Sequence, residues 1–153
     1  MSAEARIAEL GLELPPAPAP VASYVPVVVS GSLAFVAGQI PLAEGRLMWS
    51  GKLGAGLDVE AGSKAARRCA MQALSVLRDA LGSLDRVRRV VKVTVWVASA
   101  EGFTDQPKVA NGASDLLAEV FGEAGRHARA SVGAPELPLG SPVEVELIAE
   151  VEP

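Results

Sequence analysis

Residues 91–97 read Val91-Lys92-Val93-Thr94-Val95-Trp96-Val97, and this alternation decides the fold prediction. A period of two sends the valines to one face of a β-strand and the intervening residues to the other face. We expect the valine face to be buried. The segment is therefore predicted to be a strand that sits centrally in a sheet.

The segments on both sides of this strand predict an α+β order. One helix should run from a cap at Asp58 to about Leu81, and a second should start near Asp105 with Pro107 in its first turn. Further strands are expected at residues 24–29, 33–39, 128–133 and 143–151, with a short third strand near residues 47–49. The order is β-β-(β)-α-β-α-β-β, in which the last two strands are expected to form a hairpin.

Two helices of this length can cover only one face of such a sheet. The uncovered face must find another partner, and the natural partner is a second copy of the chain. A symmetric ring of subunits would bury the remaining apolar side chains and would place pockets at the subunit boundaries.

The length of 153 residues fits one domain that spans residues 1–153. Residues 1–22 are predicted to be an N-terminal arm on the surface. The arm should contain a short helix over residues 3–10 after Ser2 and then an extended lead-in. The prolines of this lead-in are Pro15, Pro16, Pro18 and Pro20.

The composition narrows the class of protein. Half of the residues are hydrophobic, and the net charge of −4 argues against binding to nucleic-acid phosphates. Cys69 is the only cysteine, so no intrachain disulfide and no thiol metal cluster can form. The sequence shows neither a signal peptide nor an apolar run that could span a membrane, and we expect a cytoplasmic protein.

Arg129 and Glu144 are the best candidates for chemistry. If the last two strands form a hairpin centred on residues 136–137, these two side chains lie opposite each other. A guanidinium can hold a substrate carboxylate, and a glutamate can activate a water. The alternative is a purely structural cross-strand ion pair. Glu146, Glu150 and Glu152 share the predicted face of Glu144, and alternating glutamates on a last strand are typical of a solvated face, so the alternation alone does not single out Glu144.

Several motifs occur in an order that resembles the RidA (YjgF) family of reactive-intermediate deaminases, especially a longer subgroup. They are Tyr24, Phe35-Val-Ala-Gly-Gln-Ile-Pro41, Asn111, Ala128-Arg129-Ala-Ser-Val132, Leu137-Pro138 and Val143-Glu144-Val-Glu146. The resemblance covers about residues 24–150. It implies a chorismate-mutase-like fold, a homotrimer and three clefts between subunits.

In that family the reaction is hydrolysis of enamine and imine acids, such as 2-aminoacrylate and 2-iminopropionate, to 2-keto acids and ammonia, without a metal or an organic cofactor. The resemblance implies that Arg129 clamps the substrate carboxylate and that Glu144 activates the water. It also implies that Tyr24 lines the cleft, that Gly38 offers backbone polar groups, and that Asn111 supports the site.

The chain departs from the family pattern at two positions beside Arg129. His127 stands where the family often has proline, and it is a candidate proton donor to departing ammonia. Ser131 stands where the family often has cysteine, and it is expected to contact the substrate.

Two other functions stay open at this point. One is a non-catalytic trimer that binds a small carboxylate as a sensor or regulator, which would need Arg129 but not Glu144. The other, more remote, is an endoribonuclease or translation inhibitor, although a single histidine offers no pair of imidazoles for RNA cleavage.

Overall fold

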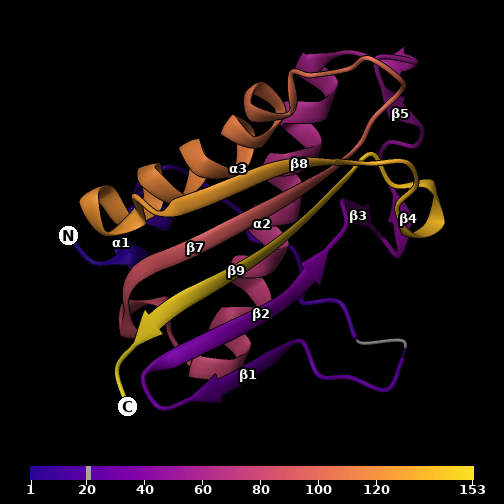
Figure 1. The fold of residues 1–153 in the computed structure, drawn as a ribbon. Helices are drawn as coiled ribbons and strands as arrows, with labels where there is room; N and C mark the ends of the chain where they lie inside the picture. Colours follow the sequence, from indigo (N-terminus) through magenta and orange to yellow (C-terminus); the bar gives the residue numbers. More distant parts are fainter. Residues whose placement is uncertain (20–21) are drawn as a thin grey trace.

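The computed structural model describes residues 1–19 and 22–153. Five strands form the main sheet, and two long helices pack on it (Figure 1). The main elements are α1 (Ala3–Glu9), β1 (Val27–Ser30), β2 (Leu33–Gln39), α2 (Val59–Leu81), β7 (Val87–Ala98), α3 (Gln106–Phe121), β8 (Ala128–Ala134) and β9 (Val143–Val151). Two small two-stranded ribbons lie between β2 and α2, formed by β3 (Leu42–Ala43) with β4 (Arg46–Leu47) and by β5 (Lys52–Leu53) with β6 (Gly56–Leu57). Short 3₁₀ turns occupy Leu84–Arg86, Gly122–Gly125 and Pro138–Gly140.

The main sheet is mixed, with the strand order β1-β2-β9-β7-β8. Its pairs are antiparallel except for β7 with β8, which run parallel. In Figure 1 helix α2 crosses behind the sheet, α3 lies beside it along β8, and no helix covers the front of the sheet. These features confirm the predicted α+β class, the element order and the two helices on one face.

Helix α2 begins and ends, and α3 begins, where the sequence predicts. The Asp58 side chain accepts a hydrogen bond from the Ala61 amide at the start of α2, and Gly82 ends this helix in a left-handed conformation. Helix α3 follows Asp105, with proline in its first turn. The two helices approach each other closely at Gly112. A β-carbon at this position would collide with the Ser63 backbone carbonyl, so only glycine fits there.

The predicted hairpin of the last two strands is wrong. Strand β7 lies between β8 and β9 and forms hydrogen bonds with both of them. The connection from β8 to β9 therefore crosses β7. Turn residues between two strands do not show whether the strands pair, because a third strand from elsewhere in the chain can enter between them.

The strand at residues 91–97 is longer than predicted and its register shifts. Strand β7 is paired on both sides, as expected, although β9 occupies the middle of the sheet. An irregularity between Val90 and Lys92 turns Val90 to the buried face and leaves Val91 37% exposed. Val93, Val95 and Val97 are fully buried, as predicted.

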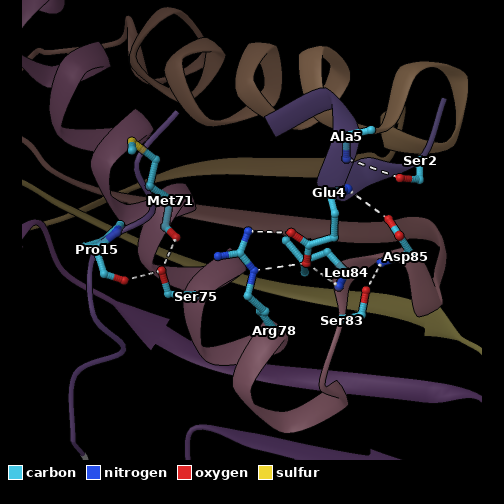
Figure 2. Close-up of polar contacts among 10 residues, drawn as sticks. All are labelled: Ser2, Glu4, Ala5, Pro15, Met71, Ser75, Arg78, Ser83, Leu84 and Asp85. Atoms are coloured by element: carbon cyan, nitrogen blue, oxygen red, sulfur yellow. Dashed lines mark hydrogen bonds and ion pairs between the residues drawn. The ribbon is translucent and has the colours of Figure 1, made fainter. Parts of the chain in front are cut away.

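The N-terminal helix is anchored to the domain (Figure 2). Glu4 accepts hydrogen bonds from Arg78 Nε at 3.0 Å and Nη2 at 2.7 Å, and its Oε1 also accepts from the Leu84 amide at 2.9 Å. The amide of Glu4 donates to Asp85, and Ile7 of the same helix is 4% exposed. The predicted helix is confirmed, but α1 is partly buried against the domain.

The chain after α1 continues along α2 as an extended segment. Ser75 Oγ donates to the Pro15 carbonyl at 2.6 Å, which attaches this segment to the helix (Figure 2). Pro20, which was predicted to continue the extended lead-in, lies outside the described residues. Cys69 is completely buried in α2, and burial raises the pKa of its thiol well above the ordinary value.

Across residues 1–19 and 22–153, no helix has the length and apolarity needed to cross a membrane.

Candidate functional site

Arg129 and Glu144 do not meet within one chain. Arg129 pairs with Val93 and Glu144 pairs with Trp96, on opposite sides of β7. Strand spacing of about 4.8 Å and a rise of about 3.3 Å per residue put their α-carbons on the order of 14 Å apart.

The two side chains also lie on opposite faces of the sheet. Paired residues point to the same face, so Arg129 shares the helix-covered face with the buried Val93. Glu144 shares the open face with Trp96, which is 37% exposed. An ion pair between Arg129 and Glu144 of the same chain is therefore excluded, and a site that uses both needs two copies of the chain.

Arg129 is held against the first turns of α3. Its Nη1 donates to Asn111 Oδ1 at 2.8 Å and to Ser114 Oγ at 3.0 Å, and its Nη2 donates to the Pro107 carbonyl at 3.3 Å. A guanidinium has five N–H donors, so Nε–H and one Nη2 hydrogen have no acceptor among the described residues. This remaining edge has the geometry that binds a carboxylate with two hydrogen bonds.

His127 supports Arg129 through Ser114. Its Nδ1 lies 2.6 Å from the Gly125 carbonyl, which can only accept, so Nδ1 carries the proton and Nε2 accepts from Ser114 Oγ at 2.9 Å. Burial lowers the pKa of His127, the positive charge of Arg129 lowers it further, and the bond to Gly125 opposes both. With both ring nitrogens occupied, the imidazole is better placed to support Arg129 than to donate a proton.

Glu144 lies over the backbone of Gly38 on the open face. The bulge in β2 between Val36 and Gln39 brings this glycine under the carboxylate. A β-carbon at position 38 would collide with Glu144 Oε1 and would lie 2.9 Å from its carboxyl carbon. Only glycine therefore leaves the observed position of the carboxylate free.

The surroundings of Glu144 disfavour the charged form of its carboxylate. Its neighbour on the same face, Glu146, accepts a hydrogen bond from Trp96 Nε1 at 3.0 Å. Glu144 receives no hydrogen bond from the described residues. Desolvation by burial raises the pKa of Glu144, and the negative charge of Glu146 raises it further.

The remaining predicted residues divide between these two regions. Tyr24 and Gly38 line one pocket of about 460 Å³ at the end of β2. Ser131 lies two residues beyond Arg129 in β8 and hence on the same face, and its buried hydroxyl has no hydrogen-bond partner among the described residues. The structure therefore gathers Arg129, Asn111, His127 and Ser131 near α3, and Glu144, Gly38 and Tyr24 around β2 and β9.

Neither region resembles a metal centre. Within the described ranges, no group of three or more His, Cys, Asp or Glu side chains is arranged to hold a metal ion.

Two residues of these regions escaped the sequence analysis. Ser114, which links His127 to Arg129, lies three residues after Asn111 and hence on the same face of α3. That spacing could have revealed it. Arg68 of α2 lines the pocket that contains Tyr24, and no local pattern separates it from the other arginines of the helix.

Comparisons with known proteins match nearly the whole chain. A family model described as "YjgF/chorismate mutase-like, putative endoribonuclease" matches residues 4–151. Protein TCP17 of Trypanosoma cruzi is 50% identical over 148 residues, which cover 96% of this chain and 92% of that protein.

Solved structures agree with this match. The crystal structure of Atu1372 from Agrobacterium tumefaciens, a protein of unknown function, has 44% identity and a TM-score of 0.91 over 98% of this chain and 92% of that chain. The structure of E. coli TdcF with bound serine has 25% identity and a TM-score of 0.63 over 89% of this chain and 94% of that chain.

Proposed function

Because this chain belongs to the YjgF/RidA family, we propose that it hydrolyses small enamine and imine acids to 2-keto acids and ammonia, at a site shared by two copies of the chain in a homotrimer. The observation that carries the proposal is the carboxylate of Glu144, half-buried over Gly38 and without a hydrogen-bond donor among the described residues.

Glu144 acts as the general base in this proposal. It accepts a proton from water while the water oxygen attacks the imine carbon, which gives a carbinolamine. Glu144 returns this proton to the imine nitrogen, which completes the carbinolamine. The carbinolamine hydroxyl then gives its proton, through Glu144, to the same nitrogen, so that the carbon–nitrogen bond breaks, ammonia leaves and the carbon–oxygen double bond of the keto acid forms. A raised pKa makes the ionised Glu144 a stronger base, which suits this step.

Arg129 holds the substrate carboxylate. Asn111, Ser114 and the Pro107 carbonyl fix three of its donors, so the guanidinium plane is oriented before the substrate arrives. The open Nε edge then binds the carboxylate and fixes the direction from which the imine carbon meets the water. Ser131 offers its unpaired hydroxyl on the same side of β8.

A shared site is the arrangement that brings these groups together. Since Arg129 and Glu144 occupy opposite faces of their own sheet, one copy must supply the arginine and a neighbour the glutamate. The open face also exposes Phe35 to 42% and Trp96 to 37%, and such apolar side chains favour burial against another copy.

Mixed oligomers of two inactive variants test the shared site. Arg129→Met and Glu144→Gln are each expected to lose most activity on imines freshly generated from amino acids by an oxidase. In a ring, co-expression in equal amounts makes one interface in four intact, so about a quarter of the parent activity should return. No recovery in verified mixed oligomers would contradict the shared site.

The parent protein tests the chemistry itself. It should accelerate the appearance of 2-keto acid and ammonia over buffer alone. If the parent matches the uncatalysed rate with imines of both small and large side chains, the deaminase proposal fails.

A non-catalytic carboxylate binder is the second candidate. The E. coli TdcF structure with bound serine favours it, because serine is a small molecule with a carboxylate. The binder would retain affinity for small amino or keto acids, lose it in Arg129→Met, and show no turnover.

An endoribonuclease, the description attached to the family model, is the less favoured alternative. The single histidine has both ring nitrogens engaged, so RNA cleavage by imidazole acid–base catalysis lacks its groups.

A further inference from the structure

A pocket of about 460 Å³ lies between the extended N-terminal segment, α2 and the end of β2. This volume falls in the range of sites for small molecules. Its walls include the prolines and alanines of residues 15–19 together with Pro26, Ile40 and Leu139, so most of the surface offered to a ligand is apolar. We call it the arm pocket.

The walls of the arm pocket are fixed by hydrogen bonds. On one side, Ser75 Oγ holds the Pro15 carbonyl at 2.6 Å. On the other side, Gln72 is 2% exposed; its Oε1 accepts from the Leu42 amide at 2.7 Å, and its Nε2 donates to the Ile40 carbonyl at 2.6 Å. The cavity is therefore preformed.

Arg68 is the only cationic side chain among the residues that line the arm pocket. Its Nε donates to the Leu42 carbonyl at 2.8 Å, which anchors the guanidinium beside the cavity. Neither Nη1 nor Nη2 has an acceptor in the part of the chain that the structure describes, and no carboxylate there lies within 4.0 Å of Arg68. The neighbouring Arg67, in contrast, pairs with Glu119 at 3.0 Å.

An apolar cavity with one partly buried and unpaired guanidinium favours a ligand that has both an anionic group and an apolar group. Such a cation is stabilised by an anion that accepts two hydrogen bonds, and the prolines favour an apolar group next to it. Glu44 also lines the cavity and is exposed, so its charge is screened by water more than that of a buried group.

We propose that the arm pocket binds a small carboxylic acid with an apolar tail, with the carboxylate on Nη1 and Nη2 of Arg68 and the tail between Pro15, Pro18 and Ile40. Within one chain, the arm pocket is separate from the anion-binding edge of Arg129, which lies on the edge strand β8. In the proposed oligomer a neighbouring copy brings its own Arg129 to Glu144, so the arm pocket lies next to that site. It borders the Glu144 region through Gly38, which lines the arm pocket and also lies under the carboxylate of Glu144.

Titration calorimetry of the full chain with 4-methylpentanoate tests this proposal, with 4-methylpentan-1-ol as the uncharged probe. The acid should bind the parent, and the alcohol should bind about ten-fold more weakly or worse. Arg68→Met should weaken binding of the acid by about ten-fold or more. Arg67→Met, which removes a neighbouring guanidinium outside the pocket, should leave the affinity within about two-fold.

Arg129→Met separates the arm pocket from the proposed active site. If Arg129→Met still binds 4-methylpentanoate and Arg68→Met does not, the acid binds in the arm pocket, as proposed. If Arg129→Met loses binding of the acid and Arg68→Met keeps it, the arm-pocket proposal is overturned. The proposal is also overturned if the parent does not bind the acid at millimolar concentrations.

Amide NMR shifts of the parent make the test independent of any variant that fails to fold. The acid should shift the amides of Leu42 and Gly45, which line the arm pocket. Shifts confined to Ser114 and its neighbours would contradict the proposal.

Discussion

Two glutamates, both only partly exposed, have opposite surroundings in this molecule. Glu4 of the N-terminal helix accepts three hydrogen bonds, two from Arg78 and one from the Leu84 amide (Figure 2). Glu144 lies over a glycine, beside a second glutamate, and receives no hydrogen bond from the described residues. A carboxylate whose acceptors are satisfied stabilises the fold, whereas one that is desolvated without partners is available for chemistry.

The largest effect is expected for Glu144→Gln. The amide keeps the shape but cannot take a proton from water, so kcat/KM for imine hydrolysis should fall about 10²- to 10⁴-fold. Steady-state assays measure this. Glu146→Gln, on the same face, is the matched control and should keep most of the activity.

Glu144→Gln should not lower stability. The folded chain raises the pKa of Glu144, so it favours the protonated form, and stability is lost as pH rises through the folded pKa. At neutral pH the Tm of Glu144→Gln should therefore equal or exceed that of the parent, and the difference should shrink in acid, where Glu144 is protonated in both the folded and the unfolded chain. A clear loss of Tm at pH 7 would assign Glu144 a structural role like that of Glu4.

Gly38→Ala should have the next largest effect. The new methyl group would occupy the position of the Glu144 carboxylate, which must swing away, because the group it meets is the flexible end of a side chain. We expect kcat/KM to fall about ten-fold or more with little change in Tm. Activity equal to that of the parent would show that the observed carboxylate position is not the working one.

Glu4→Gln should change stability and leave the chemistry intact. Loss of charge-assisted hydrogen bonds to Arg78 should lower the free energy of unfolding by about 1–3 kcal/mol, measured by urea denaturation. Glu9→Gln, which breaks only the exposed ion pair with Arg6, should cost less than about 1 kcal/mol. A large fall in kcat for Glu4→Gln at temperatures where the variant is folded would contradict a purely structural role of Glu4.

The smallest effect is expected in the pH profile of Glu146→Gln. The negative charge of Glu146 raises the pKa of Glu144, so its removal should lower that pKa. The acid limb of kcat/KM follows the ionisation of Glu144 and should therefore move to lower pH. An unchanged limb would mean that another group controls it.

Local patterns predicted the elements of the fold well. Ser2, Asp58 and Gly82 mark helix ends in the sequence as in the structure, because capping involves residues only a few positions apart. The strands at Leu33–Gln39 and Val143–Val151 have the predicted bounds. The shift at Val91 was missed, since a bulge depends on the partner strand and not on the alternation itself.

The sequence by itself determined the main helices and strands and the family resemblance, and it indicated Arg129 and Glu144 as candidates for chemistry. Only the tertiary structure decided that β7 separates β8 from β9, and that these two side chains therefore face opposite sides of the sheet. The physical reason is that periodicity and capping are local, whereas strand pairing joins segments far apart in the chain. The same non-local packing created the arm pocket, where residues 15–19 meet α2 and the end of β2.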